Sequence, residues 1–381
     1  MKFRLQDWIP ALLLLISLII HLSLISKGPV SVDCLNLAIN SKATLLDHHL
    51  HYLEGSGYPL MVLLGSIFIA AGKCIGIADP VVAVNFVSVV FSSFAILTLY
   101  LLVKKICDPL TAILASTILL FNPIFLDISI YGMSHAPALC FLLLGLLSLL
   151  RFQTNNKTSD LLLCSLCLGF MGATRLQDLI VTLPAITFVF FIGLKKDYLQ
   201  KPKHKLLNYI LFLILISLII FLFHLPYLTF DHTNYMIQSK NYWKLNLTNS
   251  FIGSFPRPIL ISITYLIKAF NIVGIICFMA GLYYTAALNK RLLVLIILWW
   301  IIPLNLYGNI ITSSPRFYSI LLPVIIIPIS IYLSNKLREK NKLSKMIAML
   351  VFLVIILVPL FQPLITFIRR HNISLISDYY R

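Results

Sequence analysis

The chain has 381 residues, of which 60% are hydrophobic and only 11% charged, and it carries a net charge of +17. Soluble domains contain about 25% charged residues, so this composition excludes an ordinary soluble globular protein. The basic residues stand in short runs beside apolar segments, which is typical of cytoplasmic loops near anionic lipid and not of a nucleic-acid-binding face. We therefore expect residues 1–381 to form one multi-pass membrane domain without a nucleic-acid partner.

Apolar runs long enough to cross a bilayer recur along the chain. The first run is longer than the apolar region of a signal peptide and no small-residue cleavage site follows it, which favours a retained span. The fold class that we predict is an all-α polytopic protein with about eleven transmembrane helices. The spans are expected at residues 8–25, 80–103, 109–126, 136–151, 160–174, 178–194, 207–225, 262–287, 292–311, 317–334 and 346–367.

The distribution of lysine and arginine decides how residues 59–77 are placed. This run is apolar but is interrupted by small residues and Lys73. If it crossed the membrane, the basic runs at 195–205 and 336–345 would face outward, against the positive-inside rule. We therefore expect an interfacial helix at the outer surface and a cytoplasmic N-terminus.

Two polar intervals then lie on the outer side. Residues 27–79 form the first outer loop with its interfacial helices, and residues 226–258 form the second. The seven cysteines lie mostly in or beside apolar spans, where small packing residues are common. Cys164 and Cys167 form a CxxC pair without polar support, so we expect packing there as well.

The predicted topology brings four polar features to the outer face: the loop with Asp33, the turn 127–135, the turn 175–178 and the turn 313–316. Arg175 and Arg316 stand there against the positive-inside tendency, and a basic residue at this boundary needs a partner. A phosphate fits, because a guanidinium can bind it with two parallel hydrogen bonds. Alternatively, each arginine anchors its helix among headgroups or pairs with an acid, as Arg175 with Asp178.

The order of these features resembles that of the GT-C superfamily of membrane glycosyltransferases, in particular the group of protein O-mannosyltransferases and lipid A aminoarabinose transferases. The resemblance covers roughly residues 1–330. It rests on an acid at the start of the first outer loop, a turn ending in Tyr-Pro-Leu, a basic inner turn, and two later arginine turns. The elements are Asp33-Cys34, Gly57-Tyr58-Pro59-Leu60, Lys104-Lys105, Asn122-Pro123, Tyr131 to His135, Arg175-Leu-Gln177 and Arg316-Phe-Tyr318.

Two positions depart from the family pattern. Cys34 stands where a second acid is usual, and Ser134-His135 stand where the family often has Asp or Glu. A metal bound between those acids would lose ligands here, so we predict a metal-independent protein with no cofactor. Asp47, His48, His49 and His51 could form a metal cluster, although histidines in a polar surface loop are more often solvated.

The resemblance implies transfer of a sugar from a polyprenyl-phosphate carrier to a lipid, glycan or protein acceptor at the outer face. One carboxylate suffices as general base because a lipid phosphate is a good leaving group. The resemblance gives that role to Asp33, whose alternative role is to cap the helix that follows. Arg175 and Arg316 would bind the donor phosphate. The substrate pocket would include Tyr58, Tyr131, His135, Tyr318 and Trp243, although aromatic residues also gather at membrane interfaces.

Other classes of function remain open at this point. A secondary transporter requires ionisable residues in mid-span, and Lys268 is the one clear example. A flippase or a non-catalytic protein of the same fold is a further alternative. These readings differ in what they predict for Asp33, Arg175 and Arg316, which only an enzyme of the expected kind needs to bring together in one outer site.

Overall fold

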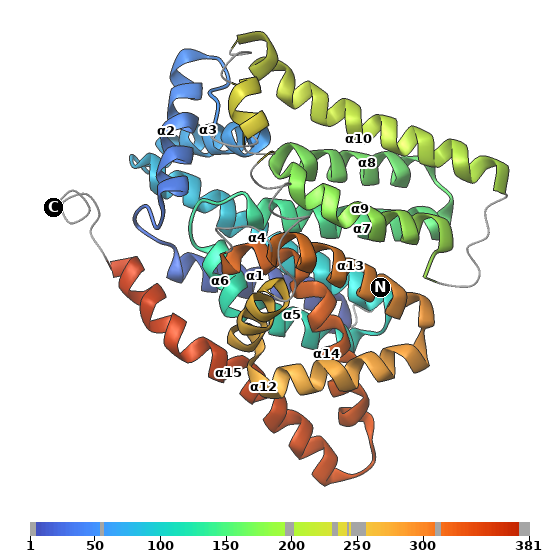
Figure 1. Cartoon of the computed structure of the whole chain (residues 1–381). Helices are drawn as coiled ribbons and strands as arrows, with labels where there is room; N and C mark the ends of the chain where they lie inside the picture. The colour runs from blue at the N-terminus through green and yellow to red at the C-terminus, as the bar shows by residue number, and fades with distance from the viewer. Residues whose placement is uncertain are drawn as a thin grey trace.

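The computed structural model describes residues 5–53, 57–194, 202–230, 235–241, 244, 257–308 and 314–372. Within these ranges the regular elements are helices, which confirms the all-α fold class (Figure 1). They are α1 Leu5–Leu24, α2 Val32–Asp47, α3 Pro59–Cys74, α4 Pro80–Ile106, α5 Pro109–Leu120, α6 Pro123–Ser129, α7 His135–Asn155, α8 Thr158–Thr174, α9 Leu176–Ile192, α10 Pro202–Phe230, α12 Arg257–Leu288, α13 Lys290–Gly308, the 3₁₀ helix η1 Pro315–Leu321, α14 Leu322–Arg338 and α15 Lys342–Asn372.

Many of these helices are suited to a membrane. In the described part of the chain six are long and apolar enough to cross one, or seven if the bent pair α5–α6 counts as a single span. Shorter apolar helices lie in α1, α3, α8 and α9. The protein is therefore an integral multi-pass membrane protein, while eleven spans and the interfacial position of α3 stay predictions.

Two expected spans are not straight helices. The chain bends by 65° between α5 and α6, where the side chain of Asn122 accepts hydrogen bonds from the first amides of α6 and Pro123 opens that helix. Proline has no amide hydrogen and fits the first turn of a helix, so Asn122-Pro123 starts a new element instead of continuing α5. In α12 the backbone of Asn271 leaves the helical region at φ 53°, which produces a kink.

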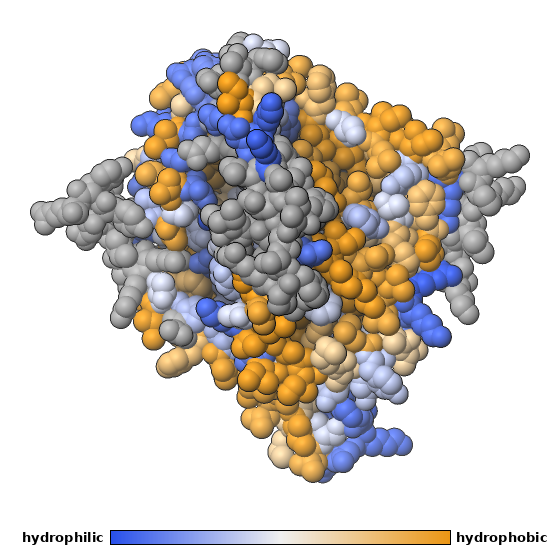
Figure 2. Space-filling model, viewed as in Figure 1, coloured by the Kyte–Doolittle hydropathy of each residue, from blue (hydrophilic) through white to orange (hydrophobic). Residues whose placement is uncertain are grey.

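The helices divide into a buried centre and an exposed periphery. In the most apolar stretch of α7, 89% of the residues are buried, whereas the value for α10 is 11%. Figure 2 shows a broad hydrophobic band between hydrophilic residues over α2 at one end and others near the α14–α15 turn. Apolar side chains exposed in such a band contact lipid in a membrane protein, so α10 is a peripheral helix of the bundle.

The segment between α1 and α4, which we predict to lie on the outer side, is folded into two helices. Ser31 caps α2, because its side chain accepts a hydrogen bond from the amide of Cys34. The capping role considered for Asp33 therefore belongs to Ser31. α2 packs against α3 and α4, and Gly65 permits the close approach, since a Cβ there would lie 2.2 Å from the Ser41 hydroxyl.

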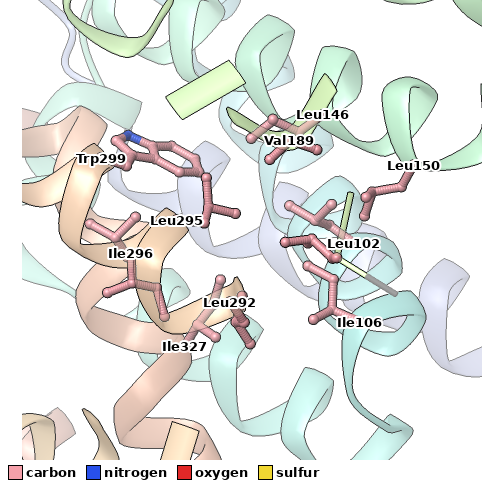
Figure 3. A pocket seen from close by; sticks show the side chains of 12 residues that line it. Leu102, Ile106, Leu146, Leu150, Val189, Leu292, Leu295, Ile296, Trp299 and Ile327 are labelled. Atoms are coloured by element: carbon pink, nitrogen blue, oxygen red, sulfur yellow. The ribbon is translucent and has the colours of Figure 1, made fainter. Parts of the chain in front are cut away.

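The central helices pack through apolar side chains at the ends that lie away from α2. Side chains from α4, α7, α9, α13 and α14 surround a cavity of about 20 Å³ (Figure 3). Leu150, Val189 and Trp299 are among its lining residues. A gap of this size with an apolar lining stays dry, because a buried water requires polar partners. Three of these helices carry polar residues at their other ends, where the candidate site lies.

Candidate functional site

Asp33 and Arg316 meet although 283 residues separate them. A guanidinium nitrogen of Arg316 lies 2.5 Å from a carboxylate oxygen of Asp33. Asp33 belongs to the first turn of α2 and Arg316 to η1. The Asp33 side chain is 54% exposed and that of Arg316 is 22% exposed, so the pair stands at the boundary between protein and solvent.

The ring of Phe317 joins this pair to the second arginine. The central guanidinium carbon of Arg316 lies 5.8 Å from the ring centre, and that of Arg175 lies 5.4 Å from it. Cations at such distances are attracted to the electron-rich face of an aromatic ring. The structure therefore brings Asp33, Arg175 and Arg316 together around one aromatic residue, as the predicted outer site requires.

Arg175 occupies a buried network. Its Nε donates to Asp178 at 2.8 Å and another guanidinium nitrogen donates to the Ser134 hydroxyl at 3.1 Å. The phenol of Tyr307 donates to the other carboxylate oxygen of Asp178. Both partners of the ion pair are almost fully buried, at 2% and 3% exposure. The sequence-based alternative of an Arg175–Asp178 pair is thus what the structure shows.

Local backbone structure explains the position of both arginines. Arg175 separates α8 from α9 with an extended backbone, φ −154° and ψ 89°, and Asp178 lies in the first turn of α9, where an acid is favoured by the helix dipole. Ser314 is extended before Pro315, as residues before proline usually are. Pro315 then starts the 3₁₀ helix that presents Arg316 and Phe317.

His135 and Tyr58 complete the cluster. The His135 ring packs edge-on against Phe317 with a centroid distance of 5.6 Å. His135 is 2% exposed, and neither of its ring nitrogens has a hydrogen-bond partner among the described residues. The ring of Tyr58 lies 5.9 Å from the Arg175 guanidinium, and its hydroxyl accepts a hydrogen bond from Gln177. Two predicted pocket residues are therefore in contact with the arginine cluster.

The remaining predicted pocket residues have other surroundings. The Tyr131 hydroxyl donates to Asp127 at 3.2 Å, and Tyr318 is buried against Tyr265 at a centroid distance of 5.1 Å. Trp243 lies outside the described residues, as does most of the second outer loop at 226–258. The pocket role of Tyr131 and Tyr318 stays a prediction.

Asn85 on α4 holds the backbone around the cluster. Its side-chain oxygen accepts from the amide of Gly132 at 2.6 Å and from the thiol of Cys34 at 3.4 Å, while its amide group donates to the Ser26 carbonyl at 2.8 Å. These bonds join the end of α1, the start of α2 and the turn before α7. Asn85 therefore fixes the positions of the segments that carry Asp33 and His135 relative to each other.

Cys34 takes part in this support and not in the site. It is fully buried beside Asn85. Burial raises the pKa of the Cys34 thiol to about 11, so at neutral pH it is a protonated donor and not a thiolate ligand for a metal.

Sequence reasoning missed Tyr307 and Asn85. Tyr307 follows the apolar residues of α13, where an aromatic residue is equally typical of an interface belt. Asn85 is one polar residue inside the apolar helix α4, and its importance depends on three segments that are distant in sequence. The available signal was that a buried polar side chain in a membrane helix requires partners.

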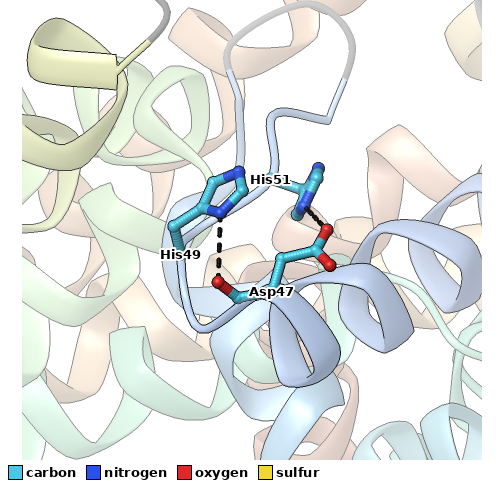
Figure 4. Close-up of side chains that lie close together, drawn as sticks. All are labelled: Asp47, His49 and His51. Atoms are coloured by element: carbon cyan, nitrogen blue, oxygen red, sulfur yellow. Dashed lines mark hydrogen bonds and ion pairs between the residues drawn. The ribbon is translucent and has the colours of Figure 1, made fainter.

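Possible metal ligands occur away from the arginine cluster. Among the described residues, Asp47, His49 and His51 form one group whose ligand atoms all lie within 4.8 Å of one another (Figure 4). This group follows α2 at the end opposite to Asp33. The predicted absence of a metal at the arginine cluster stays a prediction.

Comparison of the sequence with known proteins gives one family. Residues 61–221, less than half of the chain, match the family described as dolichyl-phosphate-mannose-protein mannosyltransferase. No curated protein matches the sequence. The matched segment begins in α3 and ends in α10, so it includes Arg175 and His135 but neither Asp33 nor Arg316.

Comparison of the structure gives a consistent fold. The ArnT protein of Cupriavidus metallidurans bound to undecaprenyl phosphate aligns with a TM-score of 0.64 at 12% identity, over 91% of this chain and 63% of that one. The oligosaccharyltransferase AglB of Archaeoglobus fulgidus with an inhibitory peptide and a dolichol-phosphate gives 0.61 at 14% identity, over 95% and 55%. An oligosaccharyltransferase of Archaeoglobus fulgidus in the apo form gives a TM-score of 0.60 at 15% identity, over 96% of this chain and 56% of that one.

These matches show that the chain shares the fold of the ArnT and AglB structures, as the GT-C resemblance of the sequence led us to expect. At this level of identity they show the fold alone. The chain spans about half to three fifths of the length of the solved structures that it matches.

Proposed function

From this fold and from the cluster that contains Asp33, Arg175 and Arg316, we propose that the protein transfers a sugar from a polyprenyl-phosphate carrier to an acceptor on the outer face of the membrane. The observation that carries the proposal is the contact of Asp33 with Arg316 next to Arg175. Three residues from distant parts of the chain supply one carboxylate and two guanidinium groups. This is the set that a transfer from a lipid phosphate requires.

Asp33 is the proposed general base. Its carboxylate is more than half exposed and is held by Arg316, so it is accessible to a hydroxyl of an acceptor. A general base must lie within hydrogen-bond reach of the proton that it removes. When the donor phosphate binds, Arg316 exchanges the carboxylate for phosphate oxygens, and Asp33 becomes available to the acceptor.

Arg316 is the proposed primary ligand of the donor phosphate. Its Nε is buried without a hydrogen-bond partner among the described residues. The guanidinium has several N–H donors, so it can form hydrogen bonds to a phosphate as its bond to the Asp33 carboxylate breaks. Arg175 is the proposed second ligand, acting from behind Phe317. Its charge is already balanced by Asp178, so it contributes a fixed positive field near the departing phosphate.

His135 is proposed to contact the same phosphate. Its two ring nitrogens are buried and have no hydrogen-bond partner in the described part of the chain. A buried polar group left in this way is costly unless a ligand satisfies it. A neutral imidazole can donate one hydrogen bond to a phosphate oxygen. This role also gives a reason why histidine stands where the family often has an acid that would repel a phosphate.

A transporter is less well supported. That function predicts ionisable residues within the spans, whereas the charged residues of this cluster lie at helix ends: Asp33 at the start of α2, Asp178 at the start of α9 and Arg316 in η1. Lys268, the mid-span residue that would favour a transporter, has an exposed side chain on α12, so the cluster supports the transferase better than the transporter.

The experiment is a transfer assay with purified full-length protein in lipid vesicles. A panel of polyprenyl-phosphate sugars with radiolabelled sugar is offered with acceptors extracted from membranes, and release of free polyprenyl phosphate is measured with the labelled product. We expect one donor to be consumed by the wild-type protein and not by the Asp33→Asn variant. Equal consumption by the two proteins, or none across the panel, would contradict the proposal.

A further inference from the structure

The end of α2 carries three side chains with the donor atoms of a metal site. Asp47 is the last residue of α2, and His49 and His51 follow in the exposed segment after it (Figure 4). The Nε2 atom of His51 lies 2.7 Å from a carboxylate oxygen of Asp47. The two imidazole rings pack together with a centroid distance of 4.3 Å.

We propose that Asp47, His49 and His51 bind a divalent transition metal ion of the zinc class. Two imidazole nitrogens and one carboxylate oxygen are a typical three-residue donor set for zinc, and the exposed side leaves a fourth position for water. Magnesium and calcium prefer oxygen ligands alone and would not select the two histidines.

The distances fit this geometry after small movements. Bonds of about 2.0–2.1 Å in a tetrahedral site place ligand atoms about 3.3 Å apart. All three ligand atoms already lie within 4.8 Å of one another, so the longest separation has to shorten by roughly 1.5 Å. Asp47 and His49 are exposed and His51 is partly exposed, and rotation about their side-chain bonds can supply this movement.

The backbone of the site is fixed on two sides. The amide of His51 donates to the Thr44 hydroxyl at 3.0 Å, which ties the segment back to α2. The hydroxyl of Tyr227 on α10 lies within hydrogen-bond distance of two carbonyls, that of His51 at 3.1 Å and that of Gly57 at 3.0 Å, and its one hydrogen can bond to either or be shared between them. A site with a preorganised backbone loses less conformational entropy when the metal binds.

The position gives the metal a consequence for the arginine cluster. The segment after His51 leads to Tyr58, whose ring faces Arg175. A metal that joins Asp47 to His51 therefore fixes residues 47–51, which follow the helix that carries Asp33 and precede the residue that contacts Arg175. This consequence rests on the proposed function, whereas metal binding itself does not.

The first test is zinc binding. Full-length protein purified with a tag that contains no histidine is treated with EDTA, exchanged into chelator-free buffer and titrated with ZnCl₂ by calorimetry. We expect about one ion per chain to bind. The affinity for zinc should fall in the His49→Ala/His51→Ala variant. Loss of a group that only hydrogen-bonds to a metal ligand lowers metal affinity by roughly 10–100-fold, and loss of two ligands should lower it further.

His48 supplies the matched control. It is the neighbouring exposed histidine, but it ends α2 in the left-handed conformation at φ 55° and is not part of the group. Asparagine tolerates this conformation, so His48→Asn should retain zinc binding. Loss of binding in His48→Asn, unchanged binding in the double variant, or no binding by the wild-type protein would overturn the proposed site.

Hydrogen exchange tests the structural consequence. Zinc should slow the exchange of backbone amides in residues 48–53 of the wild-type protein and leave the double variant unchanged. Zinc binding without such protection would overturn the fixing of this segment. A failure of the proposed transferase function would leave both readouts intact, because neither measures turnover.

Discussion

The two arginine–aspartate pairs of the cluster both lie beside Phe317 but differ in construction. Arg175 and Asp178 are three residues apart, on the two sides of a helix break, and are almost fully buried. Arg316 and Asp33 are 283 residues apart and stand partly in solvent. Asp178 is bonded to Tyr307 as well as to its arginine, whereas the partner that the structure gives the Asp33 carboxylate is Arg316.

This difference separates a fixed pair from an exchangeable one. A buried pair with additional hydrogen bonds cannot lose one partner without leaving a charge in the protein interior. A partly exposed pair contributes about 0–1 kcal/mol to stability, so its members can change partner when a ligand arrives. The buried pair therefore belongs to the scaffold, and the exposed pair is where a substrate can bind.

The largest expected effect comes from the exposed carboxylate. Asp33→Asn keeps the size of the side chain but cannot accept a proton from the acceptor. Loss of a general base costs about 10²–10⁴-fold in rate, and we expect a fall in turnover of that order with an unchanged melting temperature. Turnover is measured with the donor identified in the panel assay.

A matched variant shows whether the effect is specific. Asp160 lies in the first turn of α8 as Asp33 lies in the first turn of α2. Asp160→Asn removes the same interaction with a helix dipole at a site remote from the cluster, and it should retain turnover. Similar losses in both variants would indicate that the Asp33 effect is structural.

The next largest effect comes from the buried pair and concerns stability. Arg175→Ala leaves the Asp178 carboxylate buried without its cation, and such a change costs about 3–5 kcal/mol. Replacing both residues in Arg175→Met/Asp178→Leu should recover part of that loss, because no charge is left unpaired. Unfolding in detergent, followed by calorimetry, gives the comparison. A loss of less than about 1 kcal/mol in the free energy of unfolding of Arg175→Ala would indicate that Arg175 and Asp178 can also exchange partners.

A smaller effect is expected when Arg316 is replaced. Arg316→Ala removes a charged phosphate contact worth about 1.5–3 kcal/mol, so the affinity for a polyprenyl phosphate should fall by about 10- to 150-fold. Arg316→Lys should restore part of it, because lysine keeps the charge but lacks the planar pair of donors. Lipid binding measured by native mass spectrometry tests both variants. Normal affinity in Arg316→Ala would reduce this residue to a helix anchor.

Much of this architecture was predictable from the sequence. Hydropathy located the long apolar helices that the structure has between residues 80 and 338, because an apolar run of that length has few other structures available in a membrane. It did not predict the short helix at residues 235–241 or the break between α5 and α6. The turn signal at residues 57–59 was also sound: Gly57 has φ 87° and Pro59 starts α3. The approach of Asp33, Arg175 and Arg316 was inferred from topology and a family resemblance.

The remaining features required coordinates. Whether Arg175 pairs with Asp178 or is available to a ligand depends on side-chain directions at a helix break, and spacing alone permits either arrangement. Tyr131 and Tyr318 were chosen by their place in the motifs, and the motifs gave no sign that both side chains are buried. Asn85 acts through contacts at sequence separations of 47 to 59 residues.

The smallest expected effect tests whether the exposed pair also supports the scaffold. Cys34 follows Asp33 directly but is buried against Asn85, and its pKa of about 11 keeps the reactive thiolate scarce at pH 8. If Asn85 and not Arg316 holds the start of α2 in position, alkylation of Cys34 by iodoacetamide should be equally slow in the wild-type protein and in Arg316→Ala. Cys74 is exposed and serves as the internal positive control. Peptide mass spectrometry measures both sites in one sample. Rapid labelling of Cys34 in the variant would show that Arg316 holds α2 in place, and the distinction between a fixed and an exchangeable pair would then fail.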